Sequence, residues 1–577
     1  MESIGSCAFA DDPLQQQIYE KEAERPLGTH PEPETQPDLA WCMELLAQFN
    51  LQVSGTLDLF DSSWIEDRLP QWVADENRRD RPESPIIYQV LAIGMLSKAT
   101  TRQEETTAEA HFNYGRQLAF RNLMDEPSLL TVQAFCLTGW YMIITCRCNG
   151  AFTHIGIAAR AAYALGIHRH ETNCAFVHEA AIERARAWKS LRVCDLFLSA
   201  SMGRPPATSE NDCNIREASV SSIRDRASAL ASCQVSSAMF TICHIFERIL
   251  VEVYAKREAS LELAESISQL HRQWATKLPS ILKIDGLSKD HPNIDSQTRS
   301  MGSRTVTMAY YWSILLLSRP FLSIDVGAHQ SGAIQKKTQD GISKSITIYA
   351  DACVDTAVKA TALASDIAFD DSMPRKQPLL IEVVLFSALA LGHAYLGDYD
   401  QRGWPIGRWL DIAISTLRHL SPGNPHAARY YGICTGLRDA VGIYTQKRAD
   451  TFLKSTTQHV KHVFGDVQPE DCHGRQEQPL YVPTGDLQGE RREQMDPTTT
   501  ISTEHGHLSP HSLIVPDEQA VSRFQCGHDL GRDHASSSQG GSLSRLSPLA
   551  LNDFPFTGDV PLFSLMDEIG VEIYPMS

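Results

Sequence analysis

Apolar residues recur at helical spacing along most of the chain, from about Leu39 to about Leu453. Residues three and four positions apart share one face of an α-helix, so this pattern predicts a series of amphipathic helices. Strand signals are scarce, because runs that alternate Val, Ile or Thr with polar residues are rare. The pattern therefore predicts an all-α fold, a large multi-helical array with disordered N- and C-terminal segments.

One helix is predicted where Ile155, Ala158, Ala159 and Ala162 form a single apolar face. Gly166 follows this face directly. Glycine adopts the left-handed backbone conformation without a Cβ clash, so we expect the helix to end there and the next apolar residue to fold back onto it.

A second helix is predicted over residues 179–202, ended by the Gly-Arg-Pro sequence that follows it. Asp195 lies within the same apolar stripe as Trp188. A carboxylate on an apolar face is costly unless it has a partner. We therefore expect a partly buried ion pair between Asp195 and either Arg204 or Arg192.

Three further core helices are predicted over residues 310–317, 382–395 and 409–420. The first is nearly continuous in apolar residues and runs into the Ser-Arg-Pro sequence at 318–320. Proline has no N–H to continue the helical hydrogen bonds, so we expect this helix to end there.

Composition divides the chain into four parts. Residues 1–38 and 456–547 are polar and poor in large apolar side chains, which is typical of disordered segments. Residues 39–455 form the predicted helical domain. Residues 548–577 turn apolar again.

The segment 548–577 interleaves large apolar side chains with Asp and Glu. Such a segment stays solvated, yet its aromatic residues can dock in a hydrophobic groove as a short helix, as an acidic activation segment does. The alternative interpretation is a tail that packs back onto the core. The candidate activation residues are Phe554, Phe556, Leu562, Phe563, Leu565 and Met566.

Charge changes the picture further. The 52 Lys and Arg against 70 Asp and Glu give a net charge of −18, which repels phosphate backbones, and the densest basic run, 78–81, is short.

The longest apolar run, around 134–145, is too short to span a bilayer, so no membrane association is expected. Fourteen thinly spread cysteines suit reduced, buried thiols better than disulfides.

Two groups of cysteine and histidine residues lie close enough in the sequence to be considered as metal ligands. Cys146 and Cys148 lack a second ligand pair, so we interpret them as core thiols. His168 and His170 with Cys174 are interpreted as helix-end charge beside a loop thiol, with a weak metal site as the less favoured alternative. No metal site is predicted.

No catalytic constellation is apparent either. A magnesium-binding aspartate cluster needs a third carboxylate, which the Asp370-Asp371 pair lacks, and neither a phosphate-binding loop nor a nucleophile elbow occurs. We therefore predict that the protein is not an enzyme.

Several segments, in chain order, resemble the fungal transcription factor regulatory domain, the middle homology region of the zinc binuclear-cluster transcription factors. They are AHFNYGR at 110–116, LLTVQAFCLTGWY at 129–141, GIAARAAYALGIH at 156–168, the 184–205 stretch that ends in Gly-Arg-Pro, and SRP at 318–320. The residues singled out as structural motif positions are Arg160, Gly166, His168, Trp188, Asp195, Gly203, Arg204 and Pro205.

The sequence departs from that family at its zinc cluster. The cluster needs six cysteines in two Cys-x2-Cys-x6-Cys halves, and only Cys7 and Cys42 precede the resembling region. Either the protein lacks a DNA reader of its own, or the module was lost from this form of the protein or from its gene model. No cofactor is expected, with zinc implied only in the second case.

The resemblance implies a pathway-specific fungal transcription regulator in the nucleus, with family habit pointing to a secondary-metabolite gene cluster. It would act by binding a partner or small molecule to the helical domain. Implied partners are coactivators or related transcription factors, as homo- or heterodimer, with promoter DNA reached indirectly. The first alternative is a co-regulator or inhibitor that pairs with a DNA-binding relative without touching DNA. The second, a helical enzyme, is disfavoured.

Overall fold

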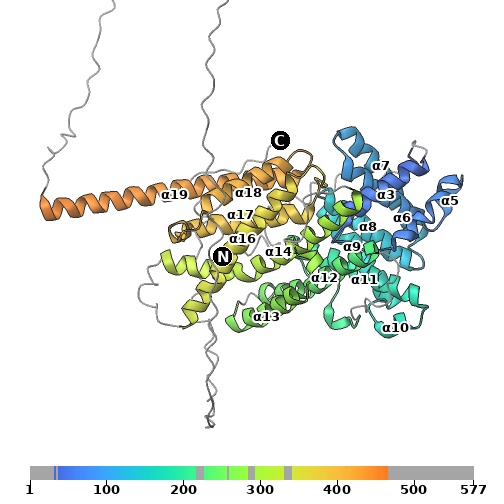
Figure 1. The fold of residues 1–577 in the computed structure, drawn as a ribbon, viewed down its shortest axis with the longest axis horizontal. Coiled ribbons are helices and arrows are strands. Elements are labelled where there is room, and N and C mark those ends of the chain that lie inside the picture. Colours follow the sequence, from blue (N-terminus) through green and yellow to red (C-terminus); the bar gives the residue numbers. More distant parts are fainter. Residues whose placement is uncertain are drawn as a thin grey trace, which may run out of the picture. The chain divides into compact units, whose positions relative to one another are not determined.

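The computed structural model describes residues 32–33, 37–215, 227–256, 259–283, 293–330 and 341–465. Within these ranges every regular element is a helix and none is a strand (Figure 1). The predicted all-α class is confirmed. The described residues up to 455 belong to one compact unit, and of a second unit, which begins at Thr456, the structure describes the end of one helix.

The N-terminal half of the described chain contains helices of 5 to 25 residues. Their bounds are α3 Leu39–Val53, α4 Ser62–Glu66, α5 Leu69–Ala74, α6 Ser84–Lys98, α7 Arg102–Asn122, α8 Leu129–Ile144, α9 Cys148–Leu165, α10 His170–Cys174 and α11 His178–Met202. The pairs α3 with α6, α6 with α7, and α8 with α9 pack closely. Their apolar faces form what we call the first core, which includes Trp72, Trp140 and Trp188.

Longer helices make up the rest. They are α12 Ala227–Arg248, continued by the π-helical turn η5 Ile249–Tyr254, α13 Leu261–Lys277, α14 Ile294–Gln330, α16 Gly341–Ala368, α17 Pro378–Leu396, α18 Ile406–Leu420 and α19 Pro425–Phe464. Helices α14, α16, α17 and α18 pack against one another and surround the second core, which includes Trp274 and Trp312. The predicted domain boundary at 455 falls inside α19.

Helix α11 supplies side chains to both cores. Trp188 and Leu198 pack in the first core, whereas Val193 and Leu196 pack in the second, and Phe197 packs against both. This explains the sequence of α11, which is apolar on more than one side. The helix lies where the two cores meet.

The predicted end of α9 is confirmed. Gly166 has φ +69°, in the left-handed region, and the N–H of Ile167 donates to the carbonyl of Ala162 at 3.2 Å. Ile167 is fully buried in the first core. The glycine therefore ends the helix and returns an apolar residue to the interior, as the sequence predicts.

The predicted end of a helix at 318–320 is wrong. Helix α14 continues through Pro320 to Gln330. A proline at this position leaves the carbonyl of Leu316 without its helical donor. The hydroxyl of Tyr254, from η5, donates to that carbonyl at 2.8 Å and so replaces the missing N–H. The break is avoided because a partner distant in sequence satisfies the freed acceptor.

The longest apolar run is also not the one expected around 134–145. Among the described residues, α17 is long and apolar enough to cross a membrane by length and composition, and 89% of that window is buried within the protein. It packs in the second core between α16 and α18, so its composition is explained by burial.

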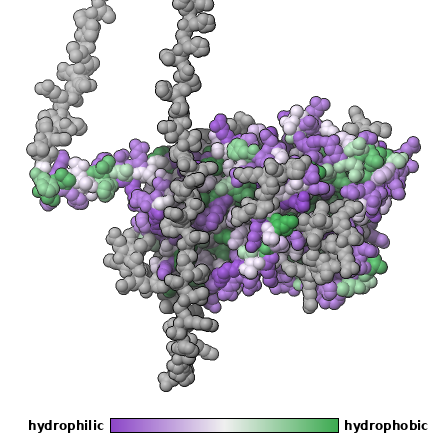
Figure 2. Space-filling model, viewed as in Figure 1, coloured by the Kyte–Doolittle hydropathy of each residue, from purple (hydrophilic) through white to green (hydrophobic). Residues whose placement is uncertain are grey.

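Hydrophilic residues cover much of the described surface, and an exception lies on α19 (Figure 2). Phe452 is 70% exposed and Leu453 is 60% exposed, and Val460, Val463 and Phe464 are also exposed. Isolated apolar residues on a surface are ordinary, but a group on one helix is typical of a contact surface.

Candidate functional site

The corner that follows α11 is built as the sequence predicts. Gly203 has φ +65°, and its N–H donates to the carbonyl of Ser199, as does the N–H of Arg204. Pro205 is exposed in the loop that follows. The Gly-Arg-Pro sequence therefore ends the helix and turns the chain across the surface of α11.

Asp195 holds that loop in place. Its carboxylate is 2% exposed and accepts hydrogen bonds from the N–H of Ala207 at 3.0 Å and from the N–H and hydroxyl of Thr208 at 2.8 and 2.6 Å. Burial raises the pKa of Asp195, and these three hydrogen bonds counteract part of that rise. Asp195 is a clamp on the backbone of the loop.

The ion pair expected for Asp195 is replaced by other pairs. Arg192 is completely buried and contacts Glu247 of α12 at 2.5 Å and Glu210 at 3.2 Å. Arg204 instead donates to the side chain of Asn149 at 2.7 Å. The prediction failed because Glu247 lies 55 residues from Arg192, and no local pattern marks it as the partner.

Of the remaining motif residues, Trp188 and His168 pack together at the corner, whereas Arg160 lies on the surface. The indole N–H of Trp188 donates to the Cys213 thiol at 3.1 Å, and the imidazole of His168 packs beside Trp188 with ring centroids 5.7 Å apart. The side chain of Arg160 is exposed on α9. Together with Asp195 and Arg192, the buried members hold α9, α11 and α12 around one corner, with each charge paired or hydrogen-bonded.

Among the described residues, no three His, Cys, Asp or Glu side chains gather in a way that would hold a metal. The Cys174 thiol lies 3.4 Å from the nearer nitrogen of His170, while His168 turns to Trp188. Cys146 and Cys148 are both buried. The six candidate activation residues between Phe554 and Met566 lie outside the described residues.

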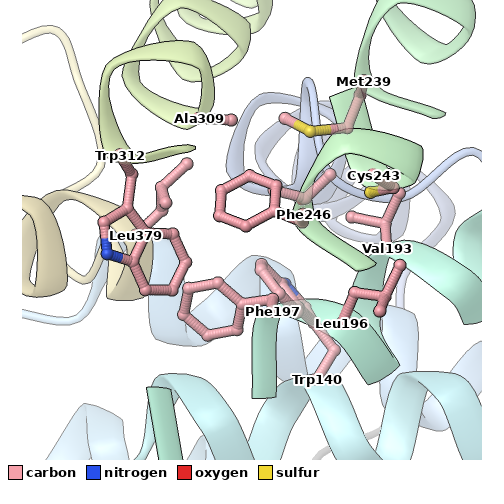
Figure 3. A pocket seen from close by; sticks show the side chains of 11 residues that line it. Trp140, Val193, Leu196, Phe197, Met239, Cys243, Phe246, Ala309, Trp312 and Leu379 are labelled. Carbon is pink, nitrogen blue, oxygen red and sulfur yellow. The ribbon is translucent and has the colours of Figure 1, made fainter. Parts of the chain in front are cut away.

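Sequence reasoning missed a cavity of about 30 Å³ where the two cores meet (Figure 3). Its wall is almost entirely apolar. The lining residues are Thr56, Trp140, Val193, Leu196, Phe197, Met239, Cys243, Phe246, Ala309, Trp312 and Leu379. Their spacing in the sequence looks like that of any core residue, so no signal distinguished them.

A second cavity of about 20 Å³ is more polar. Phe197 and the first turn of α17 contribute to its wall as they do to that of the first cavity. The polar lining residues are Cys146, Cys148, Ser201, Glu382, Asn424 and His426.

Comparison with known proteins identifies the class. Residues 65–285 match the model of the fungal specific transcription factor domain. This range contains α11, the corner and most of the first core. Residues 65–285 of this chain therefore form a fungal specific transcription factor domain, a domain of regulators and not of enzymes.

Individual relatives are distant. The chain is 22% identical over 460 residues to Filamentous growth regulator 27 of Candida albicans, covering 76% of this chain and 56% of that protein. It is 22% identical to the Thiamine repressible genes regulatory protein thi1 of Schizosaccharomyces pombe, over 56% of this chain and 40% of the relative. It is 26% identical to the Acetamidase regulatory protein of Emericella nidulans, over 52% and 36%. The chain thus spans about half or less of these relatives.

Proposed function

We propose that this protein is a pathway-specific transcription regulator that acts in the nucleus. The observation that carries the proposal is the match of residues 65–285 to the fungal specific transcription factor domain. The names of two relatives each refer to one metabolic capacity, acetamidase production and thiamine-repressible genes, which supports a single pathway as the target. The narrower target, a secondary-metabolite gene cluster, rests on family resemblance alone.

The proposed mechanism links the helical domain to the acidic segment 548–577. A partner or small molecule bound to the helices would change how far that segment is exposed to coactivators. The composition of segment 548–577, in which aromatic and acidic residues are interleaved, supports this mechanism.

Fusion of residues 548–577 to a heterologous DNA-binding domain tests the activation step. We expect reporter expression that falls when Phe554, Phe563 and Leu565 are all replaced by Ala. A matched fusion of the polar segment 500–529 should leave the reporter silent. A silent reporter with 548–577 would contradict the activation role.

A dimer with a second copy or a related regulator is the proposed partner arrangement, and α19 supports it. Ala449, Leu453, Val460 and Val463 follow a spacing of four and three residues, with Thr456 at the intervening position. This is the pattern of a coiled-coil seam. Light scattering should show a dimer for the native chain and a monomer for the Leu453→Asp, Val460→Asp double variant.

The alternative, a co-regulator that reaches promoters through a DNA-binding relative, is favoured by the net charge of −18. Chromatin immunoprecipitation combined with gel shifts separates the two. Promoter occupancy in cells without a shift by the purified chain would favour the co-regulator, whereas a shift by the purified chain would exclude it.

A further inference from the structure

The last part of α19 is a regular helix without a buried face. The last buried residue of α19 is Val441, and every residue from Gln446 to Phe464 is exposed. Figure 2 shows hydrophobic and hydrophilic residues side by side along this part, which we call the α19 arm, residues 446–464. Helices in proteins are stabilised mostly by packing of an apolar face. Contact of the apolar residues of the arm with another segment would therefore stabilise it.

An apolar stripe and a row of cations run side by side along the arm. Leu453 and Val460 lie seven residues apart on the stripe. Lys447, Lys454 and Lys461 also lie seven residues apart, so they form a lysine row beside it. The arm has four basic residues and one acidic residue, in a chain whose net charge is −18. An apolar stripe bordered by cations fits a partner that is both apolar and acidic.

The segment 548–577 of the same chain has this chemistry. It contains five Asp and Glu residues and neither Lys nor Arg. Within it, the apolar residues Leu562, Leu565, Met566 and Ile569 follow the spacing of one helical face. The pattern predicts a short amphipathic helix whose charge is opposite to that of the arm, and such a helix binds a partner through its apolar face.

The arm and this segment are joined by residues 465–547. A helix rises about 1.5 Å per residue, so the arm is roughly 30 Å long, whereas the joining stretch can extend several times that distance at about 3.3 Å per residue. Its length therefore does not prevent contact. Two binding partners in one chain also meet at a higher effective concentration than two separate molecules do.

A second copy competes for the same stripe with a weak interface. Ala449 and Thr456 occupy two positions of the coiled-coil seam, and neither fills such an interface as Leu or Ile does. A dimer through α19 is therefore weak enough for a segment of the same chain to compete with it.

We propose that residues 562–569 dock on the α19 arm of their own chain and cover the face through which a second copy would bind. Their apolar face would lie against Leu453 and Val460, and the carboxylates of the segment would lie near the lysine row. Docking and dimerisation then exclude each other, so the candidate activation residues are exposed when the dimer forms. This exclusion rests on the dimer and the activation role proposed above, whereas docking itself does not.

A fluorescent peptide of residues 558–577 tests the docking on the purified full chain. The Leu565→Ser, Met566→Ser variant disables the chain's own segment, so anisotropy should show saturable binding of the peptide. The native chain should bind the peptide at least tenfold more weakly, because its own segment occupies the arm. A peptide of the same composition in scrambled order is the control. Equal binding of the two peptides, equal binding by the two chains, or no binding would overturn the proposal.

Charge reversal on the arm tests the location. In the Leu565→Ser, Met566→Ser chain, Lys454→Glu with Lys461→Glu should weaken peptide binding at least tenfold, because the lysine row would then repel the carboxylates. The matched control is Lys277→Glu with Lys344→Glu, an equal change of charge at exposed positions of α13 and α16, and it should stay within twofold. All four lysines are exposed, and circular dichroism checks that the variants fold. Equal losses in the two pairs would contradict the assigned face.

Sedimentation velocity over a concentration series measures the exclusion. The Leu565→Ser, Met566→Ser chain should dimerise at least fivefold more tightly than the native chain. Adding the reversal at Lys454 and Lys461 should leave that dimer within twofold, because these lysines lie outside the seam. Peptide binding without any dimer would support the docking and overturn the proposed dimer. Equal dimerisation of the native and serine-substituted chains would overturn the exclusion.

Discussion

The corner and the first cavity both include residues of α11, yet their buried polar groups differ in the hydrogen bonds they make. At the corner, Asp195 accepts three hydrogen bonds and Arg192 pairs with two carboxylates. Beside the first cavity, the indole N–H groups of Trp140 and Trp312 are buried without an acceptor. The corner groups make several hydrogen bonds each, although the Nε of Arg192 makes none, and this indicates a structural role, whereas the two indoles make no hydrogen bond.

The largest effect is expected from Glu247→Leu, which leaves the buried guanidinium of Arg192 with the partly exposed Glu210 and the Thr208 hydroxyl. We expect a loss of about 3 kcal/mol in the free energy of unfolding, measured in urea, because an uncompensated buried charge is costly. Glu252→Leu is the control, since Glu252 pairs with Arg248 within one turn near the surface, and it should cost under about 0.5 kcal/mol. Similar losses in the two variants would contradict the distinction.

The carboxyl of Glu382, in the wall of the second cavity, should make the free energy of unfolding depend on pH. Glu382 has its pKa raised by burial from 4.5 to about 7, so between these values it ionises in the unfolded chain and stays protonated in the fold. Stability is therefore lost as pH rises from 4.5 to about 7, by up to about 3 kcal/mol. In Glu382→Gln this contribution should vanish.

Urea unfolding of the native chain and of Glu382→Gln at a series of pH values provides the measurement. The gap between the two should widen in favour of the variant up to about pH 7 and then stay constant. A gap independent of pH would show that Glu382 ionises normally in the fold.

Asp195→Ala should cost about 2 kcal/mol, because it removes the acceptor of two backbone N–H groups and the Thr208 hydroxyl. Thr208→Val, which removes the hydroxyl alone, should cost about half as much. Thermal melts give both values. A loss under about 0.5 kcal/mol for Asp195→Ala would mean that the clamp is not structural.

Among the variants at buried positions, Trp140→Phe is expected to change stability least, within about 1 kcal/mol, because the lost N–H has no partner. Trp188→Phe removes an N–H that donates to Cys213, and it should cost more. A larger loss in the free energy of unfolding in urea for Trp140→Phe than for Trp188→Phe would contradict the contrast between the corner and the first cavity.

Local signals carried the sequence predictions that succeeded. Gly166 and Gly203 each end a helix in the left-handed conformation, because what ends a helix is encoded within a few residues of its end. Helices α17 and α18 were likewise visible from their own apolar residues.

Partners distant in sequence explain the failures. Pro320 looks like a helix end until Tyr254 is found to satisfy the carbonyl of Leu316, 62 residues away. Arg192 looks like a partner for Asp195 until Glu247 is placed beside it. The cavity could not be foreseen, because a space is a property of how five helices fit together and no single segment encodes it.

Because α11 contributes side chains to both cores, its release affects how the protein unfolds. A helix that gives Trp188 to one core and Leu196 to the other cannot leave either without exposing apolar surface in both. We therefore expect the unfolding of the two cores to be coupled through α11.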